Sequence, residues 1–274
     1  MIKVNGQIPE VINFPDGTFK INTPFEIASH YDVLWKYENE SELIILMYVI
    51  QNLKEKGNSE IELYIPYLPN ARMDRVHKSD EVFTLKYFCK LINMLEVDRV
   101  KVLDVHSAVS AALLDRAVNI SPEAYIDKAV RDAGIDPKKD YIFFPDEGSC
   151  KRYSECFRNF SNIGFGIKKR NWEDGKIIGL DIVGENPAGK NVYIVDDICS
   201  YGGTVYHSSK KLKELGCSKI YVYFTHCENS IAKGKLFEDD MIERVYTTNS
   251  ICTLDCREYP RIKFIDCENG AEFI

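Results

Sequence analysis

The chain has 274 residues, 45% hydrophobic and 28% charged, which is enough apolar material for one large domain or two of ordinary size. Its net charge of -7 and pI near 5.4 argue against a general nucleic-acid binder, which would present a basic face. The nine cysteines are scattered without a Cys-x-x-Cys pair, so we expect reduced thiols. No membrane-spanning run or signal-peptide pattern is found, and we expect a cytoplasmic protein.

The first half of the chain predicts short strands followed by helices and strands in alternation. In chain order we expect short strands within residues 1–30, a helix over 38–57, a strand over 61–65, a helix over 84–95 and a strand over 99–103. Polar runs follow the two later strands directly, at 66–75 and 104–107. Ligands of open α/β sheets bind at the carboxyl ends of strands, so these runs are candidate binding loops.

The second half repeats this plan. We expect helices over 124–133, 151–160 and 205–215, strands over 141–144, 163–167, 192–195, 220–225, 244–247 and 262–264, and a charged, mobile segment over 171–181. The predicted fold class is therefore α/β, with two halves that each hold a mostly parallel sheet flanked by helices. We place the boundary within 114–121, giving domains 1–118 and 119–274.

The stretch from Val192 to Thr204 is the strongest local signal. A β-branched strand is followed by the pair Asp196-Asp197, a loop containing Gly202-Gly203, and the start of a helix. Backbone N–H groups at such a loop and helix start bind phosphate, while carboxylates bind ribose hydroxyls or hydrated Mg²⁺. The pattern predicts a site for a phosphorylated sugar; the alternative is an ordinary turn with a solvated acidic pair.

Several motifs, in this order, resemble those of the ribose-phosphate pyrophosphokinase family over nearly the whole chain. They are Phe14-Pro15-Asp16-Gly17, Pro66-Tyr67 through Ala71-Arg72-Met73-Asp74-Arg75, Asp104-Val105-His106-Ser107, Pro145-Asp146-Glu147-Gly148, Lys168-Lys169-Arg170 and Asp196 to Thr204. The resemblance implies two phosphoribosyltransferase-like α/β domains and an enzyme that uses ATP and Mg²⁺. Because the family's adenine-contacting turn serves a neighbouring subunit, it also implies at least a homodimer.

The resemblance assigns a role to each motif. It implies ATP binding by Phe14, Asp16, Gly17, Thr18, Arg72, Met73, Asp74 and Arg75, and ribose-phosphate binding by Asp196, Asp197, Ser200, Tyr201, Gly202, Gly203 and Thr204. It implies metal binding by His106 and Asp146 and catalysis by Lys168 and Arg170 on a flexible loop. From the residues alone, each has a plainer alternative: a surface salt bridge for the arginines, a structural histidine and a solvated basic loop.

Four positions depart from the family motifs. Thr18 stands for a Glu and Met73 for a Gln in the nucleotide motifs, and Ser200-Tyr201 replaces Asp-Thr in the sugar-phosphate loop. Tyr201 could stack on a base, and loss of a carboxylate at position 200 would reduce repulsion with an added phosphate. A larger acceptor such as ADP-ribose is therefore one hypothesis, and neutral drift in a loop that binds through its backbone is the other.

The resemblance implies transfer of the β,γ-diphosphoryl group of ATP to the anomeric hydroxyl of ribose 5-phosphate, giving phosphoribosyl pyrophosphate and AMP. Such transfer depends mainly on positioning and on neutralising the charge of the transferred oxygens. Two other functions stay open: a phosphoribosyltransferase that consumes the activated sugar, and a non-catalytic regulatory relative. The motifs at 72–75, at His106 and at Lys168 favour the kinase, because a transferase needs no ATP site.

Overall fold

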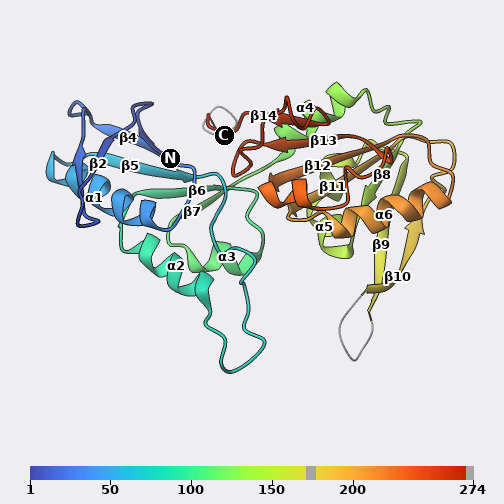
Figure 1. Cartoon of the computed structure of the whole chain (residues 1–274), viewed down its shortest axis with the longest axis horizontal. Coiled ribbons are helices and arrows are strands. Elements are labelled where there is room, and N and C mark those ends of the chain that lie inside the picture. The colour runs from blue at the N-terminus through green and yellow to red at the C-terminus, as the bar shows by residue number, and fades with distance from the viewer. Residues whose placement is uncertain (171–176, 270–274) are drawn as a thin grey trace. The chain divides into compact units, whose positions relative to one another are not determined.

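The computed structural model of the chain describes residues 1–170 and 177–269, without the side chains of 168–170, 177 and 178. The chain divides into two compact units. Unit 1 comprises Met1–Ser121 together with the segment that begins at Cys267, and unit 2 comprises Pro122–Asp266. Both mix helices with mainly parallel strands, which confirms the predicted α/β class (Figure 1).

Unit 1 is built on a five-stranded sheet in the order β1-β4-β5-β6-β7. Its strands are β1 (Ile2–Val4), β4 (His30–Trp35), β5 (Glu60–Ile65), β6 (Arg99–Leu103) and β7 (Ala117–Ile120), and its helices are α1 (Ser41–Glu55), α2 (Thr84–Asn93) and α3 (Ala108–Leu113). The strands from β4 to β7 run parallel, and β1 pairs antiparallel with β4 at one edge. A separate hairpin joins β2 (Glu10–Asn13) to β3 (Phe19–Asn22).

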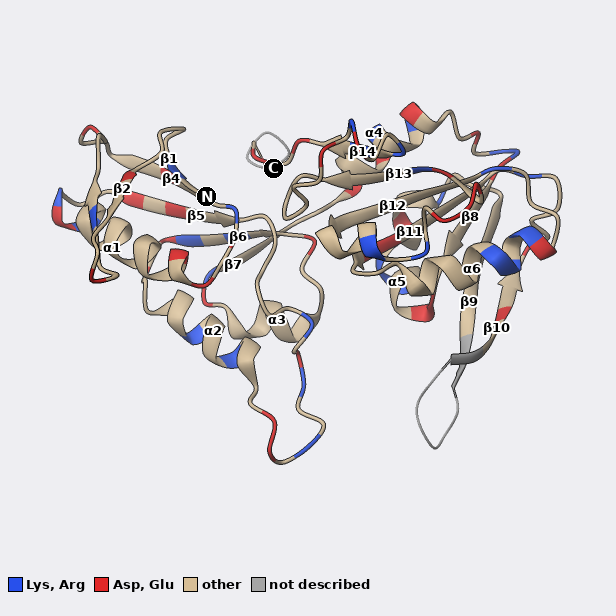
Figure 2. Ribbon diagram, in the orientation of Figure 1, with Lys and Arg blue, Asp and Glu red and all other residues tan. Residues whose placement is uncertain are grey.

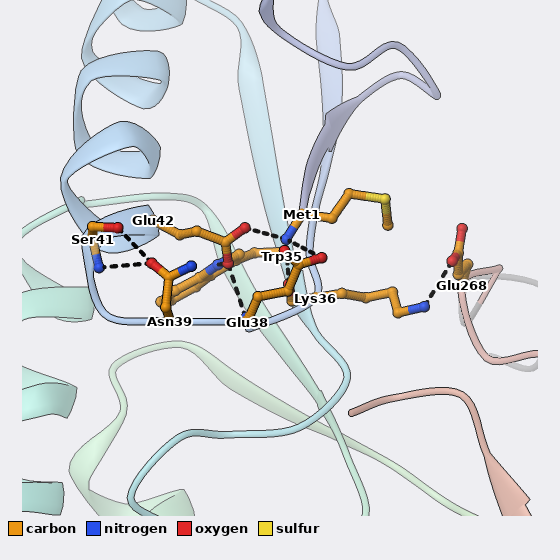
Figure 3. A network of polar contacts seen from close by, with 8 residues as sticks. All are labelled: Met1, Trp35, Lys36, Glu38, Asn39, Ser41, Glu42 and Glu268. Atoms are coloured by element: carbon orange, nitrogen blue, oxygen red, sulfur yellow. Dashed lines mark hydrogen bonds and ion pairs between the residues drawn. The ribbon is translucent and has the colours of Figure 1, made fainter. Parts of the chain in front are cut away.

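Ion pairs fasten the segment after Cys267 to unit 1. Lys36 Nζ donates to Glu268 at 2.9 Å (Figure 3), and Lys3 Nζ donates to the same carboxylate at 2.5 Å. The pKa of Glu268 lies below its ordinary value, because these two lysines outweigh the opposing effect of burial. Nearby, the buried Glu42 carboxylate accepts from Trp35 Nε1 at 3.0 Å and satisfies a polar atom in the core (Figure 3).

Unit 2 is built on a seven-stranded sheet in the order β10-β9-β8-β11-β12-β13-β14. Its strands are β8 (Tyr141–Phe144), β9 (Asn162–Arg170), β10 (Ile177–Gly184), β11 (Val192–Cys199), β12 (Ile220–Cys227), β13 (Ile242–Thr248) and β14 (Ile262–Ile265). Its helices are α4 (Glu123–Ala133), α5 (Glu147–Tyr153) and α6 (Gly203–Glu214), with 3₁₀ turns η1 (Ser154–Phe157) and η2 (Asn229–Lys233). All neighbouring strands are parallel except the β9–β10 pair.

The central strands of unit 2 are covered on both faces. Phe143 and Ile194 belong to the same apolar cluster as Leu212 of α6. The alternate residues face the other way, where Phe157 of η1 contacts the rings of Phe144 and Tyr193. Burial on both faces explains why β11 reads as a continuous apolar run rather than as an alternating pattern.

The predicted elements recur with three differences in extent, whereas β4, α3 and β7 were not predicted. The helix expected over 151–160 begins earlier, as α5, because Asp146 caps its first turn by accepting from Ser149 N at 3.0 Å. The strand expected over 192–195 continues through the acidic pair as far as Cys199, which lies opposite Cys227 of β12. The extension of β11 depends on its pairing with β12, which local sequence patterns do not reveal.

The third difference concerns the basic cluster at 168–170. It was expected on a mobile loop, but its backbone lies in β9 and pairs with β10, where Leu180 is opposite Lys168. The expected loop over 171–181 is therefore wrong for its last residues, which belong to β10. Residues 171–176 lie outside the described part of the chain, as do the side chains of Lys168 and Arg170.

Candidate functional site

The strand order of unit 2 reverses between β8 and β11. The chain passes from β8 to β9 and β10 on one side, then returns to place β11 directly beside β8 on the other side. Ligands of open α/β sheets bind where the strand order reverses, beyond the carboxyl ends of the strands. Here Asp146 follows β8, and Asp196 lies near the carboxyl end of β11. The reversal thus brings two of the sequence-predicted motifs to one edge of this sheet.

Asp197 is bound by groups from two elements of unit 2. Arg152 Nη1, on α5, donates to Asp197 Oδ2 at 2.7 Å, and Ile198 N donates to Asp197 Oδ1 at 2.8 Å. The Asp197 residue is only 8% exposed, so this ion pair lies in surroundings where it is screened little by solvent. Arg152 was not predicted as a site residue; the only local signal was a basic side chain shortly after the Pro-Asp-x-Gly motif.

Asp196 differs from its neighbour in burial and contacts. Its carboxylate accepts from Asp197 N at 3.1 Å, and the residue is half-buried. Both oxygens of Asp197 accept hydrogen bonds within unit 2 and the residue is buried, whereas Asp196 is only half-buried at the edge of the sheet. Of the two predicted carboxylates, Asp196 is therefore the better placed to bind a ribose hydroxyl.

The loop after β11 joins the strand to α6. Ser200 leads into Tyr201, which is 59% exposed, and Gly202 adopts a left-handed conformation with φ of +73° as the N-cap of α6. A side chain at Gly202 would also meet Leu236, so glycine is required there for conformation and for space. The first turn of α6 follows at once, and the N–H groups of a first turn have no acceptors within their helix. This arrangement suits an anion, as the sequence predicted.

In unit 1, two predicted motifs meet through Asp74. The loop 66–75 follows β5, and the run 104–107 follows the neighbouring strand β6. Asp74 is buried and accepts from Arg75 Nε at 2.8 Å and Arg75 Nη2 at 3.0 Å. The hydrogen bond from Arg75 is the main reason why the pKa of Asp74 lies below its ordinary value, and the Ser107 hydroxyl and the charge of His106 add to it against the effect of burial.

The other residues of the loop 66–75 reach solvent. Arg72, Met73 and Arg75 are exposed, and the Arg75 side chain is 69% exposed despite its bond to Asp74. Exposed arginines beside a buried carboxylate can bind a polyphosphate, because the guanidinium group forms paired hydrogen bonds with phosphate oxygens. Asp104, at the start of the second motif, is buried in a left-handed conformation with φ of +48°, a conformation that is uncommon outside glycine.

The predicted adenine-contacting turn connects β2 and β3. Asp16 Oδ1 accepts from Thr18 N at 2.9 Å and from Thr18 Oγ1 at 2.7 Å, and these bonds hold the pKa of Asp16 below its ordinary value. Gly17 has φ of +85°, and Phe14 is exposed. Thr18, which stands where the family motif has Glu, therefore acts within its own turn by binding Asp16.

The two predicted metal ligands lie in different units, His106 in unit 1 and Asp146 in unit 2. Asp146 Oδ1 accepts from the Ser149 backbone as the cap of α5, and imidazole is not a preferred ligand of Mg²⁺. His30, Asp32 and Glu62 bring possible ligand atoms within 4.8 Å of one another in the described part of unit 1. However, Glu62 is already paired with Arg99 at 3.0 Å and with Lys101, so its charge is balanced.

A cavity of about 370 Å³ in unit 1 is separate from the predicted motifs. Its polar lining includes Lys3, Asp32, Glu62, Lys101 and Glu268, and none of the predicted site residues lines it. The lysines in its wall form ion pairs with the glutamates beside them. The loop 66–75 is the better candidate for a polyphosphate, because Arg72 is exposed there and the Arg75 side chain stays 69% exposed while bonded to Asp74.

The distribution of charge, the cysteines and the helices can be compared with what the sequence predicted. Figure 2 shows Lys and Arg interspersed with Asp and Glu along the ribbon of each unit. All nine cysteines lie in the described residues outside any disulfide, and burial raises the pKa of Cys89 to about 11, in keeping with thiols that pack in the interior. Within the described ranges, the helices are too short or too polar to cross a lipid bilayer.

Comparison with known proteins agrees with this fold. The fold is α/β, with a mainly parallel sheet flanked by helices in each of the two units. The model of the phosphoribosyl synthetase-associated domain matches residues 174–269. The structure of phosphoribosylpyrophosphate synthetase from Mycobacterium smegmatis is similar in fold, with a TM-score of 0.76, 18% identity, and coverage of 97% of this chain and 89% of that chain.

Curated relatives extend the match along the sequence. Ribose-phosphate pyrophosphokinase 1 of Listeria innocua is 29% identical over 93% of this chain and 79% of its own length. Ribose-phosphate pyrophosphokinase of Pyrococcus furiosus is 28% identical over 89% of this chain and 86% of its own length. The chain is thus similar over most of its length to ribose-phosphate pyrophosphokinases, and these relatives support an enzyme of the diphosphokinase class.

Proposed function

We propose that the protein transfers the β,γ-diphosphoryl group of ATP to the anomeric hydroxyl of ribose 5-phosphate. A bond forms between the anomeric oxygen and the β-phosphorus, the bond between that phosphorus and the α–β bridging oxygen breaks, and AMP leaves. The anomeric hydroxyl gives up its proton. The observation that carries the proposal is the position of the Asp196–Thr204 stretch at the strand-order reversal of unit 2, directly before the first turn of α6.

Each unit has its own part in this proposal. In unit 2, the backbone of the loop 200–204 binds the 5-phosphate, and Asp196 binds ribose hydroxyls. Arg152 keeps Asp197 oriented beside it through their 2.7 Å ion pair. In unit 1, Arg72 and Arg75 bind the donor phosphates, and Asp74 orients Arg75 by accepting two of its hydrogen bonds. The two parts account for both substrates of the proposed reaction.

Mg²⁺ belongs to the proposal as the partner of the polyphosphate, whose charge it neutralises. It is usually held by one or two carboxylates, water and substrate phosphates rather than by a complete protein cage. The half-buried Asp196 carboxylate fits that mode. Asp146 fits it less well, because one of its oxygens caps α5. His106 stays a predicted ligand whose nitrogen is less suited to this ion.

Product analysis tests the proposal directly. The protein is incubated with ATP, Mg²⁺ and a panel of ribose phosphates, and the products are identified by mass spectrometry. We expect AMP and phosphoribosyl pyrophosphate in equal amounts with ribose 5-phosphate. Release of pyrophosphate from phosphoribosyl pyrophosphate and a nucleobase, without AMP formation from ATP, would instead establish a phosphoribosyltransferase.

ADP-ribose is included in that panel because Tyr201 is exposed and could stack on a base. The second reason for this acceptor is not supported by the contacts of Ser200, because Glu228 Oε2 lies 2.7 Å from Ser200 Oγ and a carboxylate is therefore present next to position 200. Sequence patterns could not reveal this contact, which joins residues 28 positions apart. Turnover with ribose 5-phosphate but not with ADP-ribose would exclude the larger acceptor.

The role of Lys168 is tested by Lys168→Ala. We expect turnover to fall at least about 100-fold while ATP affinity changes less than about twofold, because the lysine is proposed to stabilise charge on the transferring group. Lys169→Ala is the matched control, since the family motif assigns no role to that intervening lysine. Normal turnover at saturation combined with weak ATP binding would contradict the catalytic role.

A further inference from the structure

A segment that follows β12 supports the sugar-phosphate loop in unit 2. Glu228 N donates to Cys199 O at 2.8 Å, which joins the end of β12 to the end of β11. The Glu228 side chain then reaches the first residue of the loop, where Oε2 accepts from Ser200 Oγ at 2.7 Å. Ser230 Oγ donates to the same oxygen at 3.0 Å. One carboxylate oxygen therefore accepts from two hydroxyl groups, one from the loop and one from η2.

The same segment also contacts the next two residues of the loop. A Cβ atom placed on Gly234 would lie 1.9 Å from the carbonyl oxygen of Tyr201, so only glycine fits there. A Cβ atom placed on Gly202 would lie 2.2 Å from Leu236 Cδ1. Residues 200, 201 and 202 are thus each contacted by a different residue of the segment 228–236. This close packing determines where the loop can lie relative to the start of α6.

We propose that Glu228 is a positioning residue for the sugar phosphate and supplies, from outside the loop, the carboxylate that the loop itself lacks at Ser200. This inference rests on the proposed function. A hydrogen bond from a hydroxyl to a carboxylate is stronger than one between neutral groups, so it holds Ser200 in one place. Because the Ser200 proton is donated to Glu228, Ser200 does not donate to the phosphate. The phosphate is bound by the backbone N–H groups of the loop and of the first turn of α6.

Two variants test whether Glu228 acts through the hydrogen bonds that its side chain accepts or through its negative charge. In Glu228→Ala both hydroxyls lose the carboxylate and keep only their 3.1 Å contact with each other. We expect the KM for ribose 5-phosphate to rise about tenfold while the KM for ATP changes less than twofold. Glu228→Gln keeps an acceptor oxygen in place and should stay within about threefold of the wild type. This rescue by the amide distinguishes positioning from a general loss of folding, which would affect both substrates.

Ser200→Ala tests the other end of the contact. We expect it to raise the KM for ribose 5-phosphate by an amount similar to Glu228→Ala. The double variant should be no worse than either single one, because both remove the same interaction. Glu214→Ala on α6 is the matched control: its carboxylate accepts from Lys211 Nζ at 3.1 Å on the exposed side of the helix, remote from the loop in sequence. We expect its kinetics to match the wild type.

The outcomes distinguish this inference from the proposed function. If the wild-type protein neither binds ribose 5-phosphate in calorimetry nor converts it with ATP, both fail. If the wild type is active and Glu228→Ala leaves both KM values unchanged, the positioning role alone fails. It also fails if Glu228→Gln is as impaired as Glu228→Ala, or if the double variant shows the product of the single effects. If Glu228→Ala does not fold, Ser200→Ala and Glu228→Gln decide the question.

Discussion

The two candidate regions are built differently, although both lie at the carboxyl ends of parallel strands. The strand order of unit 2 reverses between β8 and β11, whereas β4 to β7 of unit 1 follow one another without a reversal. In unit 2, the acidic residue Asp197 is buried and paired with Arg152. In unit 1, Arg72 and Arg75 extend to solvent from a loop.

This difference implies that substitutions in the two regions affect stability and activity to different degrees. Buried side chains that form ion pairs or hydrogen bonds within the protein contribute to its stability. Exposed side chains that contact a ligand contribute mainly to binding. We therefore expect changes in the region of β11 to lower both stability and activity. A change at the exposed Arg72 of unit 1 should lower activity more than stability. The following predictions test this contrast, in order of decreasing effect.

The largest effect on stability is expected for Arg152→Ala. It removes the ion pair of a carboxylate whose residue is 8% exposed, and we expect the free energy of unfolding to fall by ~2 kcal/mol, somewhat less than for a fully buried pair. Chemical denaturation followed by circular dichroism measures it. Arg257→Ala is the control, because Arg257 also pairs with an aspartate, Asp255, but is 90% exposed. A loss no greater than in the control would remove the contrast between the two regions.

Arg72→Ala is expected to act on binding only. The free energy of unfolding should stay within about 0.5 kcal/mol of the wild-type value, as for other exposed positions. The KM for ATP should rise about tenfold, because a contact between guanidinium and phosphate is lost. Lys86→Ala on the exposed side of α2 removes a cation without touching the loop 66–75 and serves as the control. Destabilisation comparable to that of Arg152→Ala would show that the two regions are alike.

The smallest effect is expected for Glu268→Gln, which lies in unit 1 but outside the loop 66–75. Lys3 and Lys36 hold the pKa of Glu268 below its ordinary value, so its stabilising effect is present above the unfolded pKa of about 4.3 and is lost as pH falls through the folded value. We expect the variant to be less stable than the wild type at pH 7 by up to ~1 kcal/mol. The difference in thermal unfolding should shrink as the pH falls below about 4.3 and vanish once it lies below the lower folded pKa. A difference that is independent of pH would rule out the ion pairs as its cause.

The sequence alone determined the element types and the motifs. Apolar runs and helical periodicity identified most helices and strands within a few residues, because these patterns depend on local spacing. The loop after β11 was identified for the same reason: strand, acidic pair, glycines and helix follow one another in a single stretch. The short strand β7 and the edge strand β10 were missed, since each is stabilised chiefly by pairing with a neighbouring strand.

The tertiary structure alone decided how distant residues act on the site. Strand order places Asp146 and Asp196 at one sheet edge, and packing brings Arg152 to Asp197 and Glu228 to Ser200. These partners are 45 and 28 residues apart in the chain. No local pattern encodes such a contact, because it depends on which strands become neighbours and on how the helices pack against them.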